Sequence, residues 1–167
     1  MGKTLVVAEK PSVARDLATA LPGSFKQGKD KAFLEGDEYV ITWAVGHLVG
    51  LAEPDAYDPK LKKWRFADLP IVPDEFKLIP NDERAAKQLK VIHRQMARED
   101  VDLVINACDA GREGELIFVY VYDTAKVQPP VQRLWLSSIT RTAIEDEFSR
   151  LRDGEEMKPL EDAARSR

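Results

Sequence analysis

The sequence VDLVINACDAGREGE occupies residues 101–115 and joins an apolar run to a strongly charged loop. Its first seven residues have the β-branched, continuously apolar character of a strand that is buried on both faces of a sheet. The loop 108–115 leaves that strand, and residues 116–125 are apolar enough for a buried helix. A strand, a charged loop and a helix in this order are typical of an α/β fold.

The same unit occurs at the start of the chain and again after residue 130. Residues 5–8 (LVVA) predict a buried strand, Pro11 suits the first turn of a helix, and apolar residues then recur at helical spacing as far as Leu21. Residues 131–136 predict a third parallel strand, and an amphipathic helix follows it. Strands that alternate with helices predict an α/β fold with a parallel sheet and helices on both of its faces.

The segment between these units is less regular. A pair of strands is expected at 32–35 and 39–45, joined by a Gly-Asp turn. Residues 46–80 contain five prolines and no sustained periodicity, which predicts an irregular insertion of a kind that is usually functional. A helix with one apolar face is expected to follow this insertion.

Composition limits the classes of protein that fit. A chain of 167 residues with 44% hydrophobic and 32% charged residues is sufficient for one folded domain. The net charge of −4 excludes a protein that is held to nucleic acid by bulk positive charge, although a local basic patch stays open. One cysteine excludes an internal disulfide, and with only two histidines it excludes an ordinary structural zinc site. Because no apolar stretch approaches the ~20 residues that span a bilayer and no signal peptide is recognisable, we expect a soluble, cytoplasmic protein with no membrane partner.

Charged residues follow the first strand and the VDLVINA strand, at the point where each strand ends. In open parallel sheets, ligands bind beyond the carboxyl ends of the strands. If these two strands are neighbours, Glu9, Asp109 and Glu113 converge there, and three carboxylates repel one another unless a proton or cation lies among them. Such oxygen ligands suit Mg²⁺, and Lys10 and Arg112 would bind a phosphate there as catalytic residues. The alternative interpretation is a set of ordinary solvated loop charges.

Four motifs carry a resemblance to a known family. AEKPSVA (8–14), ITWAVGHLVGL (41–51), DAGREGE (109–115) and RLWLSSIT (133–140) resemble, in order and spacing, the N-terminal segment of type IA DNA topoisomerases, nearest to the topoisomerase III branch. That segment is the toprim domain, a Rossmann-like α/β module that primases and some nucleases share. The resemblance runs from residue 5 to about residue 167. It implies a toprim domain at 1–152, with the irregular insertion at about 46–80, and at 153–167 the start of a connection to a DNA-binding domain.

The resemblance implies a role for each acid of the crevice. Glu9 matches the glutamate that assists proton transfer at the scissile phosphodiester, and Lys10 matches the lysine that contacts the scissile phosphate. Asp109 and Glu113 match the first and last acids of the Asp-x-Asp-x-Glu metal motif, and together with Glu9 they would bind Mg²⁺. Gly111 stands where that motif has its middle acid, so the metal should bind more weakly or through more water.

The activity that the resemblance implies is transient cleavage and religation of single-stranded DNA, which changes DNA topology. Type IA enzymes cleave with a tyrosine on a separate downstream domain and form a 5′-phosphotyrosyl bond. The four tyrosines here, at 39, 57, 120 and 122, lie in none of that motif's context. We therefore expect an inactive fragment whose partners are single-stranded DNA and the remaining domains of the same topoisomerase, with no nucleotide cofactor.

Five residues are candidates for contact with DNA. His47 matches a histidine of the family's GHL motif, where a role in fixing the loop fits equally well. Lys62 and Lys63 belong to a basic cluster around a tryptophan, which is either a solvated loop or a phosphate-contacting patch with an aromatic platform. Arg133 and Ser137 lie at the end of the third predicted strand, where they would bind a phosphate or cap the next helix.

Two other functions stay open at this stage. The first is another toprim enzyme, such as a primase or nuclease domain, although the GHL and RLWLSSIT segments argue against it. The second is a non-catalytic α/β binding module with a solvated acidic loop. Such a module predicts no response to Mg²⁺, so a metal titration separates it from the enzymes.

Overall fold

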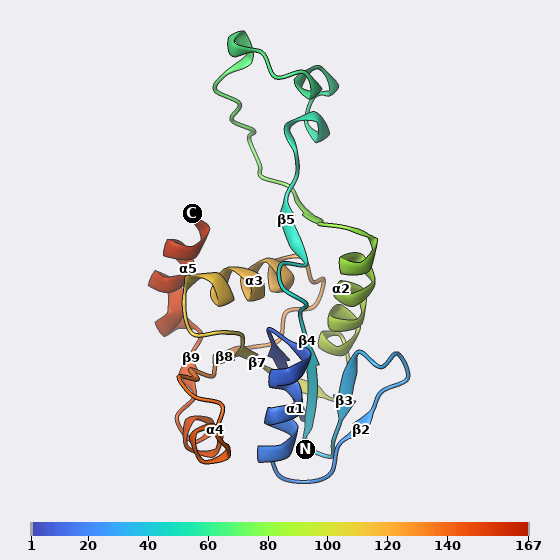
Figure 1. Cartoon of the computed structure of the whole chain (residues 1–167), viewed down its shortest axis with the longest axis vertical. Helices are drawn as coiled ribbons and strands as arrows, with labels where there is room; N and C mark the ends of the chain where they lie inside the picture. Colours follow the sequence, from blue (N-terminus) through green and yellow to red (C-terminus); the bar gives the residue numbers. More distant parts are fainter. Residues whose placement is uncertain (1, 167) are drawn as a thin grey trace.

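The computed structural model describes residues 2–166. The strands of its main sheet are β1 (Lys3–Ala8), β2 (Lys26–Gln27), β3 (Phe33–Glu35), β4 (Tyr39–Trp43), β7 (Val101–Ala107), β8 (Val131–Arg133) and β9 (Arg152–Asp153). Within the described residues this sheet has seven strands in the order β2-β3-β4-β1-β7-β8-β9, and the neighbours from β4 to β8 run parallel (Figure 1). The predicted parallel core is therefore confirmed, and short antiparallel strands extend it at both edges.

Helices enclose the sheet in two layers. They are α1 (Pro11–Ala20), α2 (Glu83–Met96), α3 (Arg112–Asp123), α4 (Arg141–Phe148) and α5 (Lys158–Arg165). The helices α1 and α4 pack on one face of the sheet, and α2 and α3 pack on the other, which confirms the predicted α/β architecture. Pro11 begins α1 as expected, and Asp82 caps α2 by accepting a hydrogen bond of 2.6 Å from the amide of Ala85.

The central strands β1 and β7 are apolar on both sides because both of their faces are covered. Leu5 and Val7 contribute to the core under α2 and α3, whereas Val6 and Ala8 contribute to the core under α1 and α4. The two strands pair in parallel as far as Ala8 opposite Ala107. This register places the residues that follow the two strands side by side, at the carboxyl ends of the parallel strands.

The strand β8 is shorter than the segment 131–136 that the sequence predicts. Beyond Arg133 the chain leaves the sheet. The ring of Trp135 then lies against two guanidinium groups, and its centroid is 5.3 Å from Cζ of Arg133 and 4.6 Å from Cζ of Arg152. The edge that β8 exposes is paired by β9, which the sequence did not predict. A strand of two residues has too little periodicity to be recognised in a sequence.

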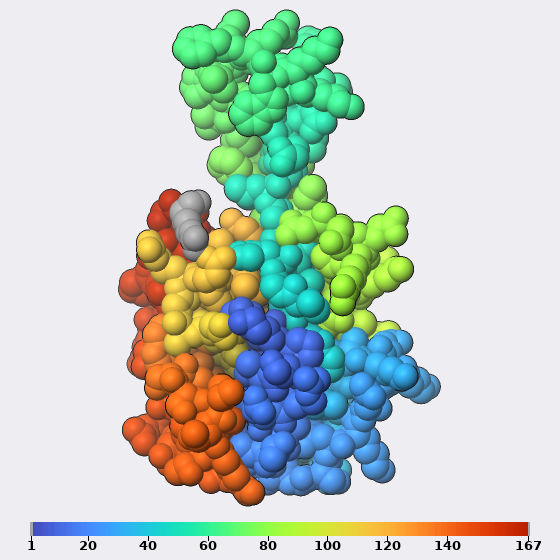
Figure 2. All heavy atoms as spheres, viewed as in Figure 1, coloured from blue at the N-terminus to red at the C-terminus, as the bar shows by residue number. Residues whose placement is uncertain are grey.

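The insertion 46–80 forms a narrow neck and a projecting arm, which we define as residues 52–77 (Figures 1 and 2). Its neck is an antiparallel ribbon of β5 (Val49–Leu51) and β6 (Leu78–Pro80). The arm itself contains three short 3₁₀ helices, η1 (Pro54–Ala56), η2 (Pro59–Lys62) and η3 (Phe66–Asp68), and no longer helix or strand. The irregular character was predicted, whereas the ribbon was not.

The last described residues belong to the α/β unit and extend it beyond the expected boundary at residue 152. After β9 and a 3₁₀ turn, η4 (Glu155–Met157), the helix α5 packs against α3. Ala164 is almost fully buried in this contact, and Arg165 forms an ion pair of 2.6 Å with Asp123 at the end of α3. Among residues 2–166, no helix has the length and apolar character that crossing a bilayer requires.

An ion-pair network joins several strands at the end of the sheet that lies opposite to Glu9 and Asp109. Glu35 at the end of β3 pairs with Lys3 of β1 and, at 2.7 Å, with Arg98, which follows α2. Arg98 also lies 2.8 Å from Asp100, directly before β7. The hydrogen bonds from Arg98 are the main cause that lowers the pKa values of Glu35 and Asp100 below their ordinary range.

We predict that this network makes the stability of the fold depend on acid pH. A carboxyl with a lowered pKa in the folded state stabilises the fold above its ordinary value of 4.5, and the contribution is lost as the pH falls through the folded pKa. Glu35→Gln should therefore lower the free energy of unfolding at about pH 7, and its difference from wild type should shrink below pH 4.5. Denaturant titrations at several pH values measure this. Asp37→Asn, on an exposed loop, is the control, and a pH-independent effect of Glu35→Gln would contradict the prediction.

Candidate active site

The register of β1 and β7 brings Glu9 and Asp109 together, although they lie far apart in the sequence. The backbone amide of Asp109 donates a hydrogen bond of 3.2 Å to Oε2 of Glu9. Glu9 is 7% exposed at the end of β1, whereas the side chain of Asp109 is largely exposed at the start of the loop after β7. We refer to this pair of carboxyl groups at the ends of β1 and β7, one buried and one exposed, as the crevice.

Lys10 places its ammonium group between these two carboxylates. Its Nζ lies 3.2 Å from Oε1 of Glu9 and 3.3 Å from Oδ2 of Asp109. Hydrogen bonds to Glu9 and then to Asp109 raise the pKa of Lys10 above its ordinary value, so the group stays protonated. The carboxylate pair thus already binds a cation, and the donor set of hard oxygens fits a divalent ion in its place. More than half of the Lys10 side chain is exposed, so it is free to swing aside.

Glu113 contacts a histidine of another loop. It lies in the first turn of α3, and its Oε1 pairs with Nε2 of His47 from the loop after β4. Among the described residues, no three His, Cys, Asp or Glu side chains are grouped closely enough to hold a metal ion. The binding of one metal ion by Glu9, Asp109 and Glu113 stays a prediction, since in this structure Glu9 and Asp109 lie together and Glu113 pairs with His47. This pairing relieves the repulsion that three clustered carboxylates would suffer.

Two glycines shape the loop that carries these acids. Gly111 has a φ of 153°, which residues with a side chain rarely adopt, so the loop is built around glycine where the family motif has its middle acid. A Cβ at Gly114 would lie only 2.1 Å from the carbonyl oxygen of Asp109. The first turn of α3 can therefore lie against the Asp109 backbone only because residue 114 is glycine.

Arg133 is buried beneath this loop instead of facing DNA. Only 1% of it is exposed, and its Nη1 donates to the carbonyl oxygens of Asn106, Cys108 and Leu134 at 2.8–2.9 Å. Its Nη2 donates to the carbonyl oxygen of Asp109 at 2.8 Å. The expectation that Arg133 binds DNA is thus corrected, because its guanidinium group is occupied by the backbone that positions Asp109.

A buried carboxylate, which was not predicted from the sequence, neutralises Arg133. Glu115 in the first turn of α3 lies 3.1 Å from Nε of Arg133 and accepts a hydrogen bond of 3.1 Å from Asn106 of β7. Burial raises the pKa of Glu115 and lowers that of Arg133, and the attraction between the two groups works against both shifts. The signal that could have found this trio is Asn106, a polar residue within an otherwise apolar strand.

The remaining candidates are exposed, and within residues 2–166 none of them forms a hydrogen bond or ion pair with Glu9 or Asp109. Arg112 begins α3, and Ser137 lies in the loop between β8 and α4. Lys62 and Lys63 lie on the arm, beyond the end of the sheet (Figure 1). His47 pairs with Glu113, and both a role in fixing the loop and a contact with DNA stay predictions.

The tyrosines and the cysteine have structural surroundings. The hydroxyl of Tyr122 donates to the carbonyl oxygen of Pro129 at 2.7 Å, and its ring stacks on Phe118. Tyr39 packs edge-on against a phenylalanine of α4, and the hydroxyl of Tyr57 accepts from a backbone amide of the arm. Cys108 is fully buried, and burial raises the pKa of its thiol. Packing or hydrogen bonds therefore hold these three tyrosines, and burial makes the Cys108 thiol a poor nucleophile.

Comparisons with known proteins agree with this geometry. The Toprim domain family matches residues 4–139. The chain is 46% identical over all 167 residues to DNA topoisomerase 3 of Bacillus subtilis, and 47% identical over 154 residues to DNA topoisomerase 3 of Bacillus cereus (strain ATCC 14579). These matches cover 100% and 92% of this chain and 22% and 21% of the relatives, so the chain spans about a fifth of their length.

A solved structure shows the same fold. The full-length topoisomerase I from Thermotoga maritima superimposes with a TM-score of 0.51 at 22% sequence identity, over 89% of this chain and 21% of that one. The sequence matches to topoisomerase 3 lie in the N-terminal part of those proteins. The chain therefore belongs to the Toprim domain family and is homologous to the N-terminal toprim domain of type IA DNA topoisomerases.

Proposed function

We propose that this chain is the metal-binding half of a type IA topoisomerase active site, which acts on single-stranded DNA together with the remaining domains of that enzyme. Its homologues are parts of larger topoisomerases that act on DNA. The observation that carries the proposal is the crevice itself, where Glu9 and Asp109 from the ends of two neighbouring parallel strands hold a cation between them.

Each residue of the crevice has a role in this proposal. Once Lys10 has moved away, Glu9, fixed by the Asp109 amide, would carry a proton and give it to the departing 3′-oxygen when a tyrosine of another domain attacks the scissile phosphate, and the proton that the tyrosine hydroxyl loses would restore Glu9. Lys10 would move from the carboxylates to the phosphate and balance its charge. Arg112, at the exposed start of α3, would contribute a second positive charge to the same phosphate.

Toprim domains of topoisomerases bind a divalent metal, and for this chain we propose Mg²⁺. Glu9 and Asp109 would hold it with their oxygens, and Glu113 would join them when it is released from His47. The ion would supply positive charge that holds the DNA for religation. The remaining contacts with DNA would come from His47, Ser137 and the arm lysines Lys62 and Lys63, in a cytoplasmic enzyme without a nucleotide cofactor.

A titration with Mg²⁺ tests the shared crevice. We expect the amide resonances of residues 9–10 and 109–113 to shift together in NMR spectra. Asp109→Asn should weaken binding by at least the roughly 10–100-fold that loss of an outer-shell partner costs. Lys10→Met should tighten it, because the ammonium group competes for the same two carboxylates.

Asp37→Asn is the control, since Asp37 is an exposed acid outside the crevice. Two results would show that the predicted cation site is wrong. In the first, Mg²⁺ shifts only the amide resonances of scattered surface acids. In the second, Lys10→Met leaves the affinity for Mg²⁺ unchanged. A complete lack of response to Mg²⁺ would favour a non-catalytic α/β binding module.

A further inference from the structure

The arm, residues 52–77, projects from the body of the molecule (Figures 1 and 2) and has no hydrophobic core of its own. Among these residues only Ala52, at the base, is buried. Polar contacts close the base instead. The hydroxyl of Tyr57 accepts a hydrogen bond of 2.7 Å from the amide of Lys77, and the Lys77 ammonium group lies 5.1 Å from the centre of the Tyr57 ring. The arm therefore buries too little apolar surface to offset the entropy that its ordering costs, and we expect a partner to stabilise it.

The large apolar side chains of the arm are exposed. Within residues 2–166, the four most exposed large apolar side chains all belong to the arm, and they are Trp64, Phe66, Val72 and Phe76. We call these four side chains the apolar arm surface, and Phe66 is 92% exposed. Beside Trp64 and Phe66 lies a cavity of about 130 Å³, whose lining also includes Leu61, Leu69 and Ile71. Exposed apolar side chains that gather on one segment mark a surface that another molecule covers.

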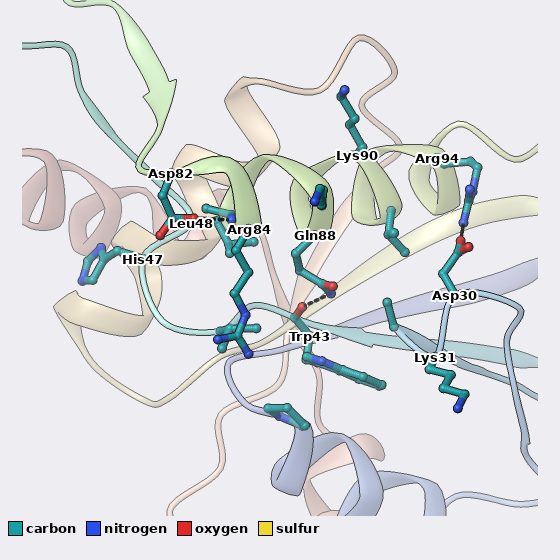
Figure 3. A pocket seen from close by; sticks show the side chains of 16 residues that line it. Asp30, Lys31, Trp43, His47, Leu48, Asp82, Arg84, Gln88, Lys90 and Arg94 are labelled. Carbon is teal, nitrogen blue, oxygen red and sulfur yellow. Dashed lines mark hydrogen bonds and ion pairs between the residues drawn. The ribbon is translucent and has the colours of Figure 1, made fainter.

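The body of the molecule has a different surface. A groove of about 680 Å³ runs along α2, and Figure 3 shows charged side chains along it, among them Arg84, Lys90 and Arg94. Water solvates such side chains well, so this part of the surface needs no cover. The exposure of large apolar side chains is therefore concentrated on the arm.

The chemistry of the arm fits a protein partner better than a nucleic acid. Its six acidic residues outnumber its five basic residues, so the arm as a whole does not attract phosphates. One of its basic residues, Arg65, is moreover paired with Asp68 at 2.9 Å. Phenyl and isopropyl groups such as those of Phe66 and Val72 gain most when they are buried against other apolar side chains.

The relatives carry a candidate partner in the same polypeptide. This chain matches the N-terminal part of Bacillus subtilis DNA topoisomerase 3 and 22% of its length, so about four fifths of that protein follow the matched part. In this structure the C-terminal end of α5 lies at the end of the body from which the arm projects (Figure 1). Polypeptide that continues from α5 therefore starts at the same end as the arm. Its attachment gives it a high effective concentration, which a second copy of the chain does not have.

We infer that the apolar arm surface packs against the polypeptide that follows α5 in the full-length enzyme, and that this contact fixes the toprim domain relative to the downstream domains. The inference rests on the proposed function, since it takes both surfaces from one topoisomerase. The downstream surface covers the arm with apolar side chains, and the cavity beside Trp64 accepts one of them. Because the contact is apolar, we expect it to persist at salt concentrations that release DNA.

Hydrogen–deuterium exchange of the arm amides tests the inference, without DNA and at high salt. It compares the isolated chain with a chimera in which this chain replaces the matching N-terminal segment of Bacillus subtilis DNA topoisomerase 3. We expect exchange of residues 52–77 to slow by about tenfold or more in the chimera. Phe66→Ser/Val72→Ser should restore fast exchange there, and it should leave the melting temperature of the isolated chain unchanged, because both side chains are exposed. Val127→Ser/Ile139→Ser alters two exposed apolar residues of the body and is the matched control, which should keep the arm protected.

Several results would overturn the inference. Equal exchange of the arm in the chain and in the folded chimera would do so, as would protection that survives Phe66→Ser/Val72→Ser. A chimera that does not fold would also count against it, because the arm would then not fit the downstream surface. A dimer of the isolated chain in sedimentation, abolished by Phe66→Ser/Val72→Ser, would assign the surface to a second copy. Protection that appears only after an oligodeoxythymidine is added would assign it to DNA.

The inference and the proposed function can fail separately. The proposed function is judged by the Mg²⁺ titration and by relaxation of plasmid, whereas the inference is judged by exchange of the arm amides. A chimera that relaxes plasmid with an unprotected arm would reject the inference alone. A folded chimera with a protected arm that leaves the plasmid supercoiled would reject the proposed function alone.

Discussion

Glu9→Gln is expected to lower the rate of DNA cleavage by about 10²–10⁴-fold in a chimera in which this chain replaces the matching N-terminal segment of Bacillus subtilis DNA topoisomerase 3. The amide of Gln keeps the size of the side chain but is far too weak an acid to protonate the leaving 3′-oxygen. Because the side chain is buried and accepts from the Asp109 amide, its place should be retained. Affinity for a single-stranded oligonucleotide should therefore stay close to that of the unaltered chimera.

The measurement is the rate of formation of cleaved oligonucleotide, with binding followed separately. Asp109→Asn is the matched comparison. It should slow religation more than cleavage, because the proposed role of the metal is to hold the DNA for religation. If Glu9→Gln cleaved at the unaltered rate, Glu9 would not be the proton donor. If it lost DNA affinity in proportion to its rate, Glu9 would act in binding instead.

Arg133→Met should destabilise the fold by about 3–5 kcal/mol, because it leaves the buried carboxylate of Glu115 without an opposite charge. Four backbone carbonyls of the crevice loop and its neighbours would lose a donor at the same time. Denaturant unfolding measures this loss. Arg152→Met is the control, since Arg152 contacts the same Trp135 ring but is exposed, and it should cost less than about 1 kcal/mol.

A second variant separates stability from positioning. Arg133→Met/Glu115→Leu removes both charges, and it should recover much of the lost stability, as replacement of buried ion pairs often does. It should still bind Mg²⁺ more weakly than wild type, because Asp109 has lost the Arg133 guanidinium that fixes its carbonyl. If the double variant bound Mg²⁺ normally, Arg133 would be structural only. If Arg133→Met were as stable as wild type, the buried network would not matter to the fold.

The crevice could be predicted because it depends on two local patterns. Apolar strands followed directly by Glu9 and by Asp109 identify the carboxyl ends of a parallel sheet, where such residues meet. The sheet and its helices follow from the same periodicities. The resemblance to type IA topoisomerases added the roles of the residues, which spacing does not reveal.

The partners of the charged residues could not be predicted. No local pattern relates His47 to Glu113, or Arg133 to Glu115, because these pairs form only when separate elements pack. Arg133 looks like a solvent-facing residue at a strand end, and only the facing carbonyls of a neighbouring loop make its burial favourable. The edge strand β9 was missed for a different reason, since two polar residues carry no alternation.

The most direct test of the central claim is a plasmid relaxation assay that compares this chain with the chimera. The account predicts that the chain alone neither nicks nor relaxes negatively supercoiled plasmid at any Mg²⁺ concentration, whereas the chimera, which gains the downstream domains of the relative, relaxes it when Mg²⁺ is present. Nicking by the chain alone would contradict the account and favour a nuclease. A folded chimera that binds DNA and Mg²⁺ but leaves the plasmid supercoiled would contradict the assignment of this crevice to a topoisomerase.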